Sequence, residues 1–174
     1  MRLLLLLIEF IKSLNNNNEK HCLWLFSQQL DKNKISVGFF TNDKGKIIEE
    51  KQTAFCFFPT KVNTNLNFII NAPFLLTDSR EGIKAGNNHN KQMIQSLAEL
   101  AASALEILKE ISITKGIELF DDETFINLIP YNENLYISEN ERTQISLLPF
   151  YTEIKNKITS SELIPCGKLA FTNY

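Results

Sequence analysis

The strongest periodic pattern in the chain runs from residue 90 to residue 111. Apolar side chains recur there every three or four residues, and polar side chains take the opposite face, which is the pattern of an amphipathic helix. At about 1.5 Å per residue such a helix is roughly 30 Å long. Asparagines at its start supply an N-terminal cap. Because several of the apolar positions are alanines, we expect the helix to pack closely across a sheet.

Two segments ahead of this helix have the composition of paired strands. Residues 35–40 and 46–58 are largely apolar and flank the sequence Asn-Asp-Lys-Gly at 42–45. That tetrapeptide is typical of a hairpin turn. We therefore predict an antiparallel pair.

A third strand is predicted at residues 68–76, after a polar connection at 59–67. Pro73 has no N–H to donate to a strand ladder. We therefore expect this strand to lie at a sheet edge, or to bend or bulge at residues 71–73.

The two ends of the chain are less regular. Residues 3–8 form a Leu-rich run that is too short to span a bilayer and is followed by Glu9 and Lys12. A short helix or strand packed into a core is therefore favoured over a signal peptide, and the asparagines at 15–18 should break it.

The region beyond Gly116 carries weaker patterns. They predict short helices at 123–129 and 149–158 and a short extended piece at 163–165. Together these elements predict an α+β fold: a small, mainly antiparallel sheet packed against one long helix, plus short C-terminal helices. The expected division is a sheet-plus-helix domain at 1–116 and a partial, truncated helical extension at 117–174.

Composition limits the classes of partner. A net charge of -2 and an isoelectric point near 5.8 give no basic field for nucleic acid or an anionic membrane. Thirteen phenylalanines against one tryptophan indicate core packing rather than a stacking surface for bases. Cys22, Cys56 and Cys166 are isolated, which favours a reducing, cytoplasmic location and disfavours zinc or a disulfide framework.

Two segments resemble an anion site or a metal site, but each also fits a simpler structural role. Residues 82–86 contain two glycines ahead of the helix, but their spacing fits neither a P-loop nor a dinucleotide fingerprint. Asp121, Asp122 and Glu123 form an acidic cluster without a neighbouring histidine. This cluster fits charge at a helix start better than a metal site.

Thiol catalysis would need Cys56 or Cys166 together with His21 or His89. Cys56 lies between two phenylalanines in a predicted strand, where burial would make the thiol inert. Cys166 has no fixed partner in the sequence. A cysteine enzyme is therefore disfavoured.

Arg80 is the charged residue that the sequence most clearly places in an exposed turn. The apolar stretch from residue 54 predicts two buried strands, and it ends in the polar turn 77–82 that contains Arg80. This arginine could be a solvated charge, a partner of Asp78 or Glu81, or a donor to a phosphate held by another domain.

Four short motifs occur in a fixed order around Arg80. They are Phe-Phe-Pro-Thr at 57–60, Thr-Asn-Leu-Asn-Phe-Ile-Ile-Asn at 64–71, the run 74–83 with Ser-Arg-Glu, and His-Asn at 89–90. In order and spacing they resemble large proteins with a sacsin-type, heat-shock-chaperone-like ATPase. The resemblance covers about residues 35–108, with a weaker echo at 162–165.

The resemblance implies that this chain corresponds to the middle, transducer-like region of a gyrase, heat-shock chaperone, histidine kinase and MutL superfamily protein. Such regions resemble the second domain of ribosomal small-subunit protein five. In that superfamily a basic residue of this region reaches the terminal phosphate of ATP in the preceding domain. The resemblance assigns that role to Arg80, with Lys84 and Lys61 as weaker substitutes. The structural motif that it implies comprises Pro59, Asn71, Phe74, Ser79 and Asn90.

The sequence also departs from the family. Asn65 stands where glycine is frequent, Asn67 where proline is frequent and His89 where tryptophan is frequent, and one arginine stands where some members have two. The motifs that hold Mg-ATP in this superfamily are missing from the sequence. ATP and magnesium are therefore expected in a parent ATPase, and this chain alone is expected to bind no cofactor and to have no catalytic residue.

Two functions follow from these observations. The leading hypothesis is a fragment that couples the ATP state of a preceding domain, or of a homologous chain, to downstream segments and to protein clients. The alternative is a free-standing interaction module whose exposed edge strand near Pro73 recruits a partner.

Overall fold

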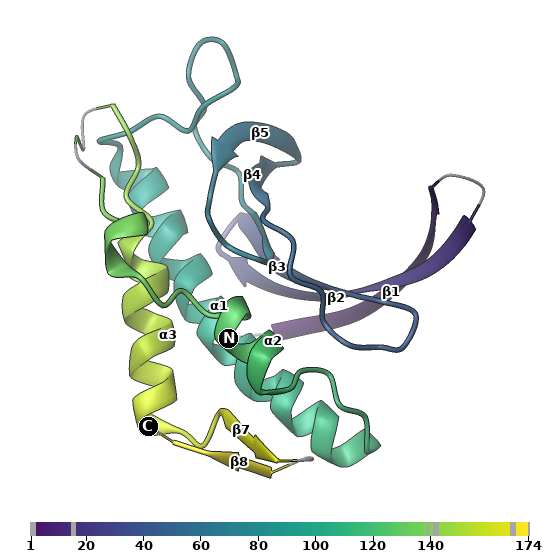
Figure 1. Cartoon of the computed structure of the whole chain (residues 1–174). Helices are drawn as coiled ribbons and strands as arrows, with labels where there is room; N and C mark the ends of the chain where they lie inside the picture. The colour runs from purple at the N-terminus through teal and green to yellow at the C-terminus, as the bar shows by residue number, and fades with distance from the viewer. Residues whose placement is uncertain (1–2, 15–16, 139, 141–142, 168–169, 174) are drawn as a thin grey trace.

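The computed structural model describes residues 3–14, 17–138, 140, 143–167 and 170–173. Figure 1 shows a sheet in one layer and helices against one of its faces, which confirms the predicted α+β class. The sheet has the strand order β1-β2-β3-β6-β4-β5. Its strands are β1 (Leu3–Leu14), β2 (Asn17–Leu30), β3 (Asn33–Thr41), β4 (Thr53–Cys56), β5 (Phe58–Asn63) and β6 (Ile69–Asn71).

Helices and a small hairpin complete the fold. They are α1 (Asn88–Lys115), α2 (Asp122–Leu128), a 3-10 turn η1 (Glu133–Leu135), α3 (Leu148–Ser160), β7 (Ile164–Gly167) and β8 (Ala170–Thr172). The predicted short helices and the extended C-terminal piece are thus confirmed, within one or two residues at most ends. Among the described residues no helix is both long and apolar enough to cross a membrane.

The Leu-rich start forms an edge strand. β1 pairs along its whole length with β2, from Leu3 opposite Gln28 to Leu14 opposite Asn17. The strand alternative for residues 3–8 is therefore confirmed and the helix alternative is wrong. Asn17 and Asn18 belong to β2, so the predicted break is wrong at these two positions, and residues 15–16 lie outside the described residues. The β1–β2 hairpin projects away from the helices (Figure 1).

The predicted strand pair around residues 42–45 is wrong beyond its turn. The turn forms, because Gly45 donates its N–H to the Asn42 carbonyl and Asn42 to that of Lys46. After one bridge between Thr41 and Ile47, however, the chain leaves β3. The Ile47 N–H bonds instead to the Leu119 carbonyl at 2.7 Å, so contacts with the segment after α1 compete with extension of the hairpin.

The sequence predicted that β4 would pair with β3, but β6 is the strand that pairs with β3. It pairs antiparallel with β3 and parallel with β4, so the expected edge position is wrong. The expected bend is confirmed: the strand ends at Asn71, and Phe74 donates its N–H to the Ala72 carbonyl across Pro73. The polar connection predicted at 59–67 is also corrected, because most of it is the edge strand β5.

The predicted long helix extends further than its periodic core. α1 has 28 residues, is capped by the side chain of Asn87, and ends at Gly116 in the left-handed conformation. Its last turn is held to the sheet by Lys115, whose ammonium lies 5.2 Å from the centre of the Trp24 ring on β2.

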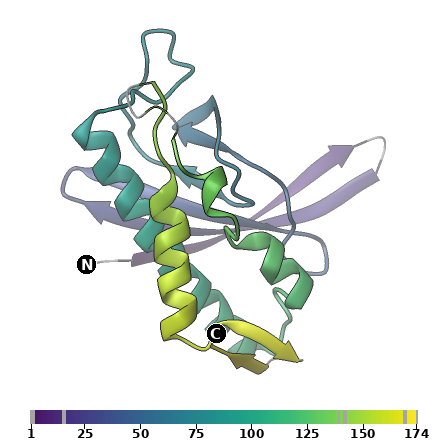
Figure 2. The ribbon, with the colours of Figure 1, turned by 60° about the vertical axis from the view of Figure 1, so that its left-hand side comes forward.

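A row of phenylalanines joins the two layers. Ring centres lie 6.0 Å apart for Phe26 and Phe39, 5.1 Å for Phe39 and Phe68, and 6.0 Å for Phe68 and Phe150. All four side chains are buried. The row runs from β2 and β3 to α3, which packs alongside α1 (Figure 2).

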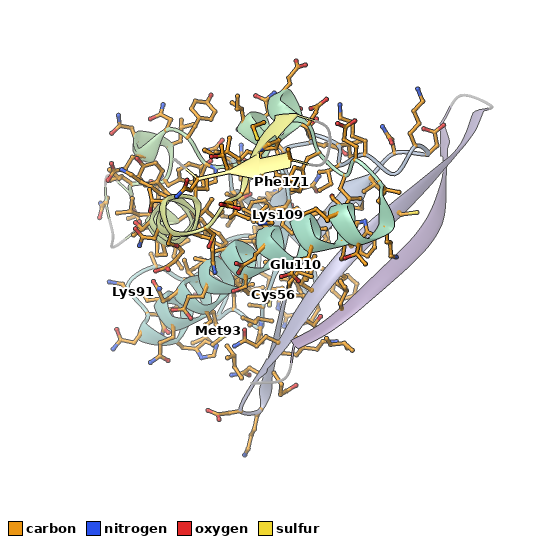
Figure 3. The ribbon with its side chains drawn as sticks, turned by 90° about the horizontal axis from the view of Figure 1, so that it is seen from below. Cys56, Lys91, Met93, Lys109, Glu110 and Phe171 are labelled. Carbon is orange, nitrogen blue, oxygen red and sulfur yellow. The ribbon has the colours of Figure 1, made fainter. Side chains whose placement is uncertain are left out.

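The small C-terminal hairpin contacts the C-terminal part of α1. Lys109 donates a 2.8 Å hydrogen bond to the Glu162 carbonyl, and its ammonium lies 5.7 Å from the centre of the Phe171 ring. Figure 3 shows Lys109 on α1 next to Phe171 on the C-terminal hairpin. Residues after the predicted boundary at 116 thus cover the helix that precedes it.

Candidate functional site

Arg80 lies at the tip of a tight loop between β6 and α1. Leu76 and Ile83 form an antiparallel bridge, and Thr77 donates its N–H to the Gly82 carbonyl at 2.8 Å. We call residues 77–82 the arginine loop. The Arg80 N–H bonds back to the Thr77 carbonyl, and Arg80 has a φ of 59°. Few non-glycine residues adopt this conformation, so the loop fixes Arg80 in an unusual geometry.

Asn90 ties the base of the arginine loop to the first turn of α1. Its side chain is fully buried. It accepts the Leu75 N–H and donates to the carbonyls of Leu75 and Lys84, each at 2.8 Å. Because one buried amide satisfies both arms of the loop, the loop and the helix are mechanically linked.

The guanidinium of Arg80 has no ion pair or hydrogen bond within the described residues. Of its two expected local partners, Glu81 pairs instead with Lys61, with 2.6 Å between the ammonium and the carboxylate. Lys61 also donates its backbone N–H to the Glu81 carbonyl. The alternative in which Arg80 pairs with Asp78 or Glu81 is therefore not observed in this structure.

The three predicted basic residues lie around this loop and differ in whether their side chains form an ion pair. Lys61 projects from β5 and forms an ion pair with Glu81, and the side chains of both residues are more than half exposed. Lys84 follows the loop and is exposed, and its backbone N–H bonds to the Leu75 carbonyl. Among the described contacts, Lys61 therefore has an ion-pair partner, whereas Arg80 at the tip and Lys84 at the base have none.

A hollow of about 480 Å³ opens beside Arg80, lined by the arginine loop and by Phe57, Phe58 and Pro59 at the turn between β4 and β5. Phe57 and Phe58 are 76% and 79% exposed. The predicted buried strand therefore ends in two exposed aromatic rings. A strand turns successive side chains to opposite faces, so the sequence Phe57-Phe58 already signals that both rings cannot share one core.

Three other residues of the implied motif do not line the hollow but form hydrogen bonds with residues that do. Asn71 accepts the Phe57 N–H at 3.0 Å through its side-chain oxygen. The buried Phe74 offers its carbonyl to the Cys56 thiol at 3.4 Å. Ser79 contacts the Thr77 hydroxyl at 3.2 Å within the arginine loop. Asn71, Phe74 and Ser79 thus shape the hairpin turn and the loop.

The thiol candidates do not form a catalytic pair among the described contacts. Cys56 donates to a backbone carbonyl, and the His89 ring lies 3.0 Å from the Pro73 carbonyl. Cys166 is exposed on β7. The side chain of His21 lies outside the described residues. No thiolate-activating contact appears at the described cysteines.

The acidic cluster serves as a helix start. Asp121 caps α2 by accepting the Thr124 N–H at 2.9 Å, and it forms an ion pair with Lys46. The bond from Lys46 and those from Thr124 hold the pKa of Asp121 well below its usual range. Glu123 is exposed, and the side chain of Asp122 lies outside the described residues. The described residues contain no group of three side chains suited to a metal.

The glycines at 82 and 86 do not form a phosphate cradle in this structure. The Gly82 N–H bonds to the Thr77 hydroxyl, and the first N–H groups of α1 at His89 and Asn90 are taken by Asn87. The expected asparagine cap at the start of the helix is therefore confirmed, with Asn87 as the capping residue.

Comparison of the chain with known protein families, with curated proteins and with solved structures gives no match.

Proposed function

We propose that this chain is the transducer-like part of a sacsin-like ATP-binding protein, in which Arg80 senses the terminal phosphate of ATP held by a preceding domain. The observation that carries the proposal is the guanidinium without a described partner, at the tip of a loop whose base is tied to α1 by Asn90. The motif order around Arg80 supports the same role.

Arginine suits such a sensor for a physical reason. Its planar guanidinium can donate two parallel hydrogen bonds to phosphate and stays charged at every physiological pH. A phosphate that holds Arg80 also holds the arginine loop, and the Asn90 bonds pass that restraint to the first turn of α1. Loss of the phosphate on hydrolysis would release the loop, as in other nucleotide-dependent switches.

The nucleotide pocket and its magnesium belong to the preceding domain under this proposal, and this chain contributes no catalytic base. We place the protein in the cytoplasm, because Cys22, Cys56 and Cys166 are all free thiols. A protein client is the expected downstream partner.

The test uses the gene that encodes this chain. An in-frame Asp-x-Gly-x-Gly motif upstream is expected, and a stop codon in its place would contradict the proposal. In the joined protein, Arg80→Ala should lower the rate of ATP hydrolysis by about 10²-fold, and Lys84→Ala by less. Lys32→Ala, an exposed lysine in the β2–β3 turn, serves as the control. Unchanged hydrolysis in Arg80→Ala removes the sensor role.

A second candidate is an interaction module with no link to ATP. Its original basis, an edge strand near Pro73, does not hold, because β6 lies inside the sheet. The exposed rings of Phe57 and Phe58 provide a different surface on which such a module would bind its partner. A stop codon directly upstream of this chain would favour this module.

A further inference from the structure

We infer that β1 pairs with the β1 of a second copy of this chain, so that two copies form one continuous sheet around a two-fold axis. β1 is an edge strand, and within the described residues only β2 pairs with it. The outer row of its backbone N–H and C=O groups therefore has no strand partner there. Such pairing requires no nucleotide and no preceding domain, so it is independent of the proposed function.

The two edges of the sheet differ in how well they are protected from pairing. The edge strand β5 is short, contains Pro59 and exposes Lys61, and its pairing with β4 is irregular. Proline, lysine and irregular pairing are features that keep an edge from joining another chain. β1 has 12 residues without proline or glycine, and it pairs with β2 in an unbroken register. Of the two edges, the β1 edge is therefore the one open to a further strand.

The composition of β1 is that of a strand inside a sheet. Residues 3–8 are all leucine or isoleucine, without the alternation of apolar and polar residues that marks a strand with one face in water. Leu5 packs against the core, whereas its neighbour Leu4 is 46% exposed. A further strand alongside β1 would cover part of this exposed apolar surface.

The shape of the fold favours a second copy as the source of that strand. The β1–β2 hairpin projects away from the helices (Figure 1), so much of the β1 edge lies clear of them. Two identical antiparallel strands are related by a two-fold axis, so their pairing uses both open edges and closes the assembly at two copies. The protected strand β5 then lies at each end of the continuous sheet.

Symmetry and charge together select the register. In a two-fold antiparallel pair, one residue lies opposite its own copy. For the strand Leu3–Leu14, the longest pairing covers about eleven positions and has Ile8 or Glu9 at that place. Glu9 there would set two carboxylates directly opposite each other, which is destabilising. We therefore place Ile8 on the axis. This register forms about ten backbone hydrogen bonds, as many as a typical protein interface contains.

With Ile8 on the axis, Leu4 of each copy lies opposite Lys12 of the other. This pair allows a test in which only the sign of one charge changes. Leu4→Lys sets two lysines opposite each other, whereas Leu4→Glu sets a glutamate opposite Lys12. Both variants lose the same leucine, at a position already 46% exposed. Combining Leu4→Lys with Lys12→Glu restores an attractive pair. Ile126→Lys, at a position on α2 that is 57% exposed, is the control for an added lysine.

The molar mass of the 174-residue chain, followed by light scattering over a range of concentrations, is the measurement. One chain has a mass of 20.0 kDa, so the wild type at high concentration should have twice that mass. Leu4→Lys should raise the dissociation constant of the dimer about tenfold relative to Leu4→Glu. The double variant and Ile126→Lys should stay close to the wild type. Far-UV circular dichroism checks that each variant keeps its sheet.

A second comparison covers the case in which Leu4→Lys fails to fold. Leu4→Glu combined with Lys12→Glu sets two glutamates opposite each other, so its dimer should again dissociate about tenfold more readily than that of Leu4→Glu alone.

Three results would overturn the inference. The first is a wild type of 20.0 kDa at every concentration. The second is a mass that keeps growing beyond two copies, because a two-fold pair is closed. The third is a dimer that responds equally to Leu4→Lys and Leu4→Glu, or as strongly to Ile126→Lys, because its interface would then not be β1 in this register. None of these results bears on the phosphate sensor, which is tested by ATP hydrolysis in Arg80→Ala.

Discussion

Asn90 and Leu75 form a reciprocal pair in which the side chain of one satisfies the backbone of the other. The Asn90 amide oxygen accepts the Leu75 N–H, and its nitrogen donates to the Leu75 carbonyl, both at 2.8 Å. The Leu75 carbonyl also accepts the Lys84 N–H, so the Asn90 side chain supplies the partner that the Leu75 N–H would otherwise find in a strand ladder. The chain can therefore leave the sheet at Asn71 and still enter α1 in a fixed geometry.

Replacing Asn90 should weaken the whole fold. Asn90→Ala leaves the Leu75 N–H and the Lys84 carbonyl without this partner, and it leaves the Leu75 carbonyl with the Lys84 N–H alone. We expect a loss of about 1–3 kcal/mol in the free energy of unfolding. Urea denaturation measures it. Asn88→Ala, at an exposed position in the same turn, should change the free energy by less than about 0.5 kcal/mol. Equal effects of the two variants would contradict the clamp.

The ion pair of Asp121 with Lys46 should make stability depend on acid pH. The lowered pKa of Asp121 means that its contribution is present above the unfolded pKa of about 3.9 and is lost as the pH falls towards the folded value. Because both side chains are more than a third exposed, we expect only about 0.5–1 kcal/mol.

Asp121→Asn isolates this charge, because asparagine and aspartate cap helices about equally well. The difference in free energy of unfolding between wild type and variant should be present at pH 6 and should shrink as the pH is lowered through about 4 to 2. Asp43→Asn, in the exposed turn after β3, is the control. A difference that stays constant over this pH range would argue against the charge effect.

The phenylalanine row should dominate the core. Phe39 is fully buried between Phe26 and Phe68, so Phe39→Ala should cost about 3–5 kcal/mol through lost burial and the cavity left behind. Phe58→Ala, at a ring 79% exposed, should cost less than about 0.5 kcal/mol. Denaturant titration of the two variants checks the contrast, and a small loss in Phe39→Ala would show that the core repacks.

Ser112 offers a stabilising change. Its hydroxyl is buried in α1 and has no hydrogen-bond partner within the described residues. Ser112→Ala removes an unsatisfied polar atom and improves helix propensity, so the free energy of unfolding should rise by about 1 kcal/mol. Ser103→Ala, whose exposed hydroxyl bonds to the Glu99 carbonyl, gains the same helix propensity but removes no buried unsatisfied atom, so the free energy of unfolding should rise by less. A destabilised Ser112→Ala would indicate a partner for this hydroxyl.

Local patterns predicted the helices well, because each depends on neighbours along the chain. The period of α1 follows from residues within a few turns, although the helix continues beyond the predicted end at 111 to Lys115. The order of the strands in the sheet does not follow from local patterns. Insertion of β6 between β3 and β4 depends on contacts such as that between Ile47 and Leu119, which no local pattern contains.

In the candidate site, too, some features could be predicted from the local sequence and others could not. The polar turn that displays Arg80 was predictable from its composition. The pairing of Lys61 with Glu81 was not, because it joins two separate segments. Asn90 was expected to contribute to a helix cap, whereas Asn87 is the cap and Asn90 the buried clamp. The exposure of Phe57 depends on a single left-handed turn.

The contact between Trp24 and Lys115 gives the protein a built-in optical reporter. Trp24 is the only tryptophan in the chain, and the ammonium of the last turn of α1 lies over its ring. Its fluorescence should therefore change when that end of the helix shifts on the sheet. Any movement that a bound phosphate imposes on the first turn of α1 could then be followed at the other end of the helix, in real time and without an added label.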